Sequence, residues 1–189
     1  RCVAGVPAHW SLTVHSKVPA IEDQDMPGFL EIEAERGFAC NPDELQISTR
    51  VYKAGEGVQY ASIVGIPRGY LERFEAVLVA AQLKPVSLSF GLTALPGVEE
   101  GAVTVEIADS RIDLLLSGTA GVMALRTIDA AFDSEGAERR VQAELLAREL
   151  RITLGQIPAE VRQDISKLNI FGEHRFAEQL LSDFQTRAR

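Results

Sequence analysis

The sequence predicts an α/β fold of mixed sheets with flanking helices in two lobes. Segments with alternating apolar residues, typical of half-buried strands, take turns with segments whose apolar residues recur every three or four positions, typical of amphipathic helices. A stretch at 91–101 that contains Pro96 and Gly97 interrupts this order and is predicted to be a hinge between the lobes. The 189 residues, 46% of them hydrophobic, are enough to bury one core that the two lobes share.

The first lobe is predicted to contain four strands and two helices. Alternating or short apolar runs indicate the strands, and apolar residues at helical spacing, with Pro near the start or Gly at the end, indicate the helices. The glycines of 53–57 suit the turn of a hairpin. In chain order we expect a strand at 10–18, a helix at 26–38, strands at 45–52 and 58–66, a helix at 69–82 and a strand at 86–90.

The second lobe is predicted to begin with three antiparallel strands. A long charged helix follows, with one apolar stripe and with Gly155 at its end. The last residues, 185–189, are polar and are expected to fray. In chain order we expect strands at 102–108, 111–117 and 121–128, a helix at 136–154, a strand at 165–170 and a helix at 176–184.

Charge and composition exclude several classes of function. The net charge is -8 and the basic residues are scattered, so no basic stripe is available for nucleic acid. The longest apolar runs, such as 114–116, are far shorter than the roughly 20 residues of a membrane-spanning helix. The start at Arg1, without a signal peptide, indicates a segment excised from a longer protein. Cys2 and Cys40 are expected to be reduced thiols.

No pattern of residues indicates an enzyme or a metal site. The three histidines lie in different predicted elements, and the glycine patterns of phosphate-binding loops are absent. Arginines mixed with glutamates on the predicted helix 136–154 are typical of a solvated face rather than of an anion site. These arginines are Arg139, Arg140, Arg148 and Arg151.

One strand end is a candidate site. The predicted strand 102–108 ends among Glu106, Asp109 and Ser110. Two acids and a hydroxyl at such an end could hold a hydrated metal or a phosphate. A strand that finishes in an ordinary polar turn is the alternative, because Asp and Ser favour turns.

Several short segments, taken in order and spacing, resemble a known family. They are Gly5-Val6-Pro7, Val18-Pro19, Pro27-Gly28-Phe29, 33–38, Asp43-Glu44-Leu45, 65–68, 80–87 and 148–156. The chain resembles the PilM family of type IV pilus assembly and, less closely, the cytoplasmic domain of the GspL proteins of type II secretion. Both belong to the actin-like ATPase (ribonuclease H-like) fold, of which this chain would be a fragment.

The resemblance implies boundaries and a cofactor. Residues 1–95 would form the first actin-like lobe, with a small β-α-β-β inserted subdomain at about 10–66, and residues 96–189 the start of the second. The family's second phosphate loop carries Asp-Ile-Gly, where this chain has Glu106-Ile107-Ala108. The resemblance therefore implies Glu106, Asp109 and Ser110 as cofactor-binding residues of a degenerate loop for ATP and magnesium. Ala108 adds a methyl group where backbone must approach phosphate.

From this resemblance we expect a noncatalytic scaffold of a type IV pilus or type II secretion-like assembly. It would lie in the cytoplasm at the inner membrane and bind the tail of an inner-membrane assembly protein, or a secretion ATPase, as a monomer or an oligomer. The first alternative is an ATP-binding actin-like ATPase whose nucleotide site is completed by residues outside this chain. The second is an unrelated α/β domain that shares only the order of its elements.

Overall fold

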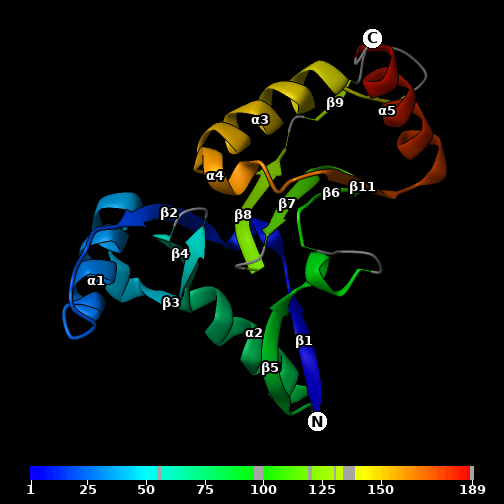
Figure 1. The fold of residues 1–189 in the computed structure, drawn as a ribbon. Coiled ribbons are helices and arrows are strands. Elements are labelled where there is room, and N and C mark those ends of the chain that lie inside the picture. Colours follow the sequence, from blue (N-terminus) through cyan, green and yellow to red (C-terminus); the bar gives the residue numbers. More distant parts are fainter. Residues whose placement is uncertain (55–56, 96–99, 119–120, 130, 134–138, 188–189) are drawn as a thin grey trace. The chain divides into compact units, whose positions relative to one another are not determined.

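The computed structural model describes residues 1–54, 57–95, 100–118, 121–129, 131–133 and 139–187. The chain divides into two compact units, Arg1–Pro96 and Gly97–Arg189. Each unit combines helices with strands, as expected for the predicted α/β class (Figure 1).

The first unit contains a parallel pair of strands. Strand β1 (Cys2–Val6) pairs with β5 (Pro85–Phe90), and the helix α2 (Arg68–Ala80) directly precedes β5 in the chain. Ala4 and Val6 are buried, whereas Val3 is exposed, so β1 has one buried face. The strand β1 was not predicted from the sequence.

A three-stranded antiparallel sheet forms the rest of the first unit. Its order is β2 (Leu12–Val18), β4 (Val58–Pro67) and β3 (Leu45–Ala54), so that β3 lies at one edge. The helix α1 (Met26–Gly37) packs on this sheet. Short 3-10 turns at Ala8–Trp10, Pro42–Glu44 and Gly91–Ala94 connect the elements. The predicted hairpin and both predicted helices of this lobe are confirmed.

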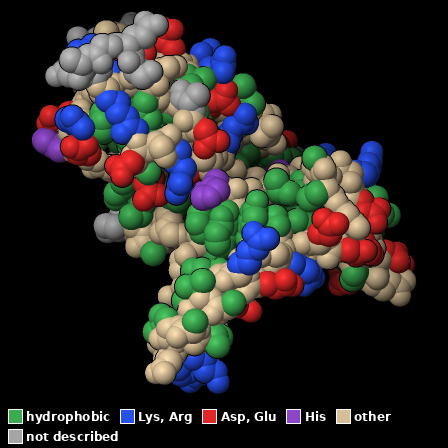
Figure 2. All heavy atoms as spheres, turned by 180° about the vertical axis from the view of Figure 1, so that it is seen from behind, with side chains coloured by type: hydrophobic (Ala, Val, Ile, Leu, Met, Phe, Trp, Pro, Cys, Tyr) green, Lys and Arg blue, Asp and Glu red, His purple; other side chains and the backbone are tan. Residues whose placement is uncertain are grey.

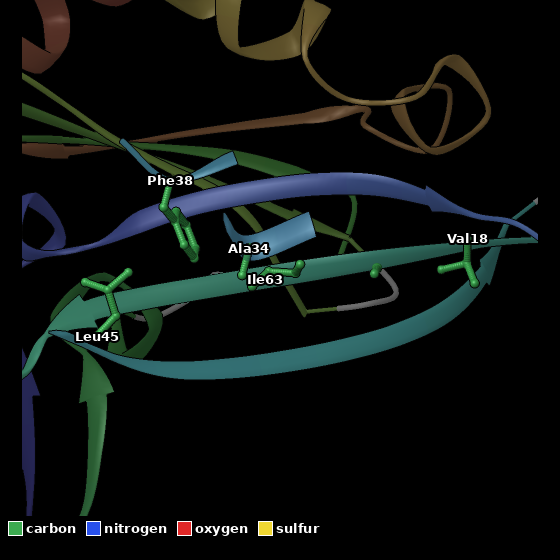
Figure 3. Packing of buried hydrophobic residues seen from close by; sticks show 6 residues of the cluster. Val18, Ala34, Phe38, Leu45 and Ile63 are labelled. Carbon is green, nitrogen blue, oxygen red and sulfur yellow. The ribbon is translucent and has the colours of Figure 1, made fainter. Parts of the chain in front are cut away.

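One core cluster of the first unit lies between α1 and one face of this sheet. Figure 3 shows Phe38 beside Leu45 and Ala34 beside Ile63, and Val18 of the same cluster lies farther along the strands. Ile63 and Val14 lie opposite each other in the β2–β4 ladder, so both face α1. This packing places α1 over β2 and β4 and leaves the adjacent face of β3 partly uncovered.

The second unit is built on a four-stranded mixed sheet. Strands β6 (Ala102–Ile107), β7 (Ile112–Gly118) and β8 (Gly121–Ile128) are antiparallel, as predicted, and β11 (Lys167–Gly172) lies parallel to β6. The order is β11-β6-β7-β8. Leu114, Leu115 and Leu116 are fully buried, so β7 has apolar neighbours on both faces.

The helices of the second unit differ from the prediction in three ways. Helix α3 (Ala143–Gly155) begins well after residue 136, because Arg140–Val141 (β10) pairs with Phe132–Asp133 (β9) as a short ladder. Arg139 and Arg140 therefore precede the helix. The last helix, α5 (His174–Arg187), continues through residues 185–187, which were expected to fray. A short helix, α4 (Ala159–Arg162), was not predicted.

Two further observations concern the whole described chain. Within the described ranges no helix is long and apolar enough to cross a membrane. Cys2 and Cys40 are both free thiols, as expected.

Candidate functional site

The predicted site at the end of β6 contains a row of polar side chains across three strands. Glu106 of β6 lies opposite Asp113 of β7, and Asp113 lies opposite Thr127 of β8. Because paired residues share a face of a sheet, the three side chains lie next to one another. We call Glu106, Asp113 and Thr127 the polar row.

Asp113 is the buried centre of this row, with only 2% of its surface exposed. One carboxylate oxygen accepts a hydrogen bond from the hydroxyl of Thr127. The other accepts a charged hydrogen bond from Nε of Arg111 at 3.2 Å. A buried carboxylate requires such partners because its desolvation is costly.

The surroundings of Glu106 disfavour its charged form. Burial raises the pKa of its carboxyl group, the charge of Asp113 raises this pKa further, and the guanidinium of Arg111 partly opposes both effects. Glu106 therefore binds a proton more readily than an ordinary glutamate does.

Asp109 and Ser110 lie apart from the buried end of the row, on the exposed tip of the β6–β7 hairpin. The N–H group of Ala108 donates to the carbonyl of Arg111 at 3.0 Å and closes the turn. The structure thus brings Glu106 together with Asp113 and Arg111 and leaves Asp109 and Ser110 at the surface.

The donor set at this turn does not fit a magnesium triphosphate site by itself. A cation, Arg111, already neutralises the buried acid, and Ala108 carries a methyl group where the resemblance implies a glycine. Among the residues that the structure describes, no group of three His, Cys, Asp or Glu side chains could hold a metal ion. Sequence reasoning missed Arg111 and Asp113; the only signal was their spacing of two residues in an otherwise apolar strand.

A second candidate site is a groove in the first unit, over the face of β3 that α1 leaves uncovered. The groove has a volume of about 660 Å³. Its floor is apolar and comes mainly from α1 and β3. The apolar lining residues are Met26, Pro27, Leu30, Ala34, Pro42, Leu45 and Ile47.

The rim of this groove is mostly acidic. Asp23, Glu31 and Asp43 line it together with one basic residue, Arg68. Arg68 donates to the carbonyl of Asp43 at 3.2 Å and to the side chain of Gln46 at 3.0 Å, and so closes one end. Acidic side chains also gather over the α1 part of the first unit in Figure 2.

Comparisons of the chain with known proteins show similarity in fold but not in sequence. No family model matches it, and no curated protein is similar to it in sequence. It is similar to the cytoplasmic domain of EpsL, an inner membrane component of the type II secretion system of Vibrio cholerae. That likeness has a TM-score of 0.58 and 15% identity over 99% of this chain and 74% of that chain. A PilM-PilN type IV pilus biogenesis complex is also similar, with a TM-score of 0.45 and 19% identity over 77% of this chain and 46% of that chain. The likeness to the EpsL domain confirms the predicted actin-like fold.

Proposed function

We propose, from the fold that this chain shares with the cytoplasmic domain of EpsL, that it is a noncatalytic scaffold of a type II secretion or type IV pilus-like assembly. It acts at the cytoplasmic face of the inner membrane. The unit Arg1–Pro96 is the first actin-like lobe and contains the inserted subdomain, and Gly97–Arg189 begins the second. The scaffold binds the cytoplasmic tail of a membrane-protein partner.

The acid-rimmed apolar groove over β3 is the observation that carries this proposal. Its floor offers Leu30 and Ile47 to apolar side chains of a partner, and its rim offers Asp23 and Glu31 to basic ones. Cytoplasmic segments next to membrane spans are rich in Lys and Arg. A short tail of mixed apolar and basic residues therefore suits the groove in both shape and charge.

The turn between β6 and β7 supports a noncatalytic role. Ala108 stands where the resemblance implies a glycine that lets the backbone approach phosphate, and Arg111 neutralises Asp113 beside Glu106. The second candidate function, an ATP-binding ATPase completed by residues outside this chain, is favoured by the shared fold itself.

The test is recovery of a partner from solubilised inner membranes on immobilised wild-type chain and two variants. Thr49 lines the groove, whereas Ser48 is exposed and alternates to the opposite face of β3. We expect wild type and Ser48→Arg to retain one pilus or secretion membrane protein. Thr49→Arg should lose it about tenfold or more, because a bulky cation repels a basic tail and fills the groove.

Two outcomes would overturn the proposal. One is recovery of the same partner by both variants, which would remove the groove from the interaction. The other is tight, magnesium-dependent binding of ATP measured by calorimetry on the longest natural chain, which would favour the second candidate.

A further inference from the structure

A hollow in the second unit gathers three arginines from two distant parts of the sequence. It has a volume of about 290 Å³ and lies between β10 and α5. We call it the arginine hollow. Its lining residues are Arg139, Arg140, Arg175, Phe176, Gln179 and Asp183.

Aromatic rings hold two of these guanidinium groups in place. The guanidinium carbon of Arg139 lies 3.8 Å from the ring centroid of Phe132, and that of Arg175 lies 4.5 Å from the ring centroid of Phe176. The rings of Phe132 and Phe176 pack edge to face with their centroids 5.6 Å apart, and Phe176 is buried. Stacking on a ring face leaves the N–H groups at the edge of the guanidinium plane available for an anion.

The wall of the hollow is fixed by a side-chain clamp. Oε1 of Gln179 accepts from the N–H group of Val141 at 3.2 Å, and Nε2 of Gln179 donates to the carbonyl of Val141 at 3.1 Å. These two hydrogen bonds tie α5 to β10, so the arginines of the two segments are held at a fixed separation. The hollow is therefore a built feature rather than a chance meeting of surface side chains.

The charge of the hollow is opposite to that of the chain. Three guanidinium groups line it against one carboxylate, Asp183, although the chain carries a net charge of -8. Arg175 also pairs with Glu173 at 3.1 Å, an exposed contact that water screens. Within the described lining residues, cations exceed anions by two, since three arginines face one aspartate.

We propose that the arginine hollow binds the phosphate group of a phosphate monoester. A phosphate presents several acceptor oxygens and close to two negative charges, which suits three guanidinium forks better than a single carboxylate does. The volume accommodates a small ester but not a folded segment of protein. Soluble phosphomonoesters and the headgroup of phosphatidic acid share this chemistry.

The experiment titrates the chain with inorganic phosphate and glycerol phosphate by calorimetry, and with phosphatidylcholine vesicles that contain or lack phosphatidic acid. Arg139→Gln and Arg175→Gln each remove one guanidinium of the hollow. Arg151→Gln is the control, because it removes the same charge from an exposed position on α3 that does not line the hollow. Thermal melts establish that each variant is folded.

We expect saturable binding of at least one probe, weakened about tenfold or more in both hollow variants and less than about twofold in the control. Arg139→Lys should weaken binding as well, because an ammonium cannot present a planar fork. Binding of the soluble esters assigns the site to a small molecule, and binding of phosphatidic acid vesicles alone assigns it to a lipid headgroup. Equal weakening by the control, or no saturable binding of any probe, would overturn the proposal.

Discussion

Removing the arginine beside the buried acid of the polar row should destabilise the second unit far more than removing an exposed arginine. In Arg111→Gln, Asp113 keeps its hydrogen bond from Thr127 but loses the guanidinium of Arg111 while Glu106 still faces it. Breaking a fully buried pair costs about 3 to 5 kcal/mol. Because the side chain of Arg111 is 34% exposed, solvent screening lowers the expected loss to about 2 kcal/mol.

A double-mutant cycle separates the pair from its surroundings. Asp113→Asn retains an acceptor for Thr127 and removes the repulsion with Glu106, so we expect a cost of about 1 kcal/mol. The double variant should cost little more than Asp113→Asn alone, which gives a coupling of about 2 kcal/mol. The control is Arg148→Gln, whose side chain is 63% exposed and which should cost less than about 0.5 kcal/mol.

Urea unfolding followed by circular dichroism gives the free energies, and amide hydrogen exchange of β7 reports on the second unit itself. The melting temperature of Arg111→Gln should fall by about 4 to 8 °C. Two results would contradict this account of the polar row. One is that Arg111→Gln lowers the free energy of unfolding no more than Arg148→Gln does, and the other is that the losses of the two single variants add up to the loss of the double variant.

Four further predictions concern other positions. Gly101 has a φ of +71, and an added Cβ would lie 2.5 Å from the carbonyl oxygen of Asp164, so Gly101→Ala should destabilise by more than 1 kcal/mol. Gly155→Ala, which meets nothing within 4 Å, should stabilise by about 0.5 kcal/mol, as chemical denaturation will measure. Burial raises the pKa of Tyr52 to about 12, so stability should fall as pH rises from about 10 to 12, and Tyr52→Phe should abolish this fall. The raised pKa of Glu106 predicts that Glu106→Gln stabilises the chain at neutral pH, with the gain disappearing below about pH 4.5 in pH-dependent melts.

Local periodicity predicted most of the elements because it depends on residues that are close in sequence. The strand β1 was missed because it is only five residues long and contains Gly5. The start of α3 was misplaced because Val141 fits the helical stripe, although it belongs to the ladder of β9 and β10. Pairing with a distant strand overrode the local preference there.

The candidate sites depended more on strand pairing than on sequence pattern. Glu106 lies near the end of β6, where the sequence placed it, but its neighbour Asp113 is set by the register of β6 and β7. The arginine hollow could not be predicted, because Arg139 and Arg175 are 36 positions apart in the printed sequence and meet only through the fold. The predicted helix also included Arg139, which in the structure precedes α3, so nothing in the sequence indicated that Arg139 lies beside Arg175.

The polar row also fixes the register of β7 against β6 and β8. If β7 slipped by one residue against its neighbours, Asp113 would exchange faces with Leu114 and lose its hydrogen bond from Thr127 of β8. A run of leucines alone would tolerate that slip, since Leu114, Leu115 and Leu116 are interchangeable in volume and polarity. One buried carboxylate therefore gives an otherwise uniform strand a single energetically acceptable position.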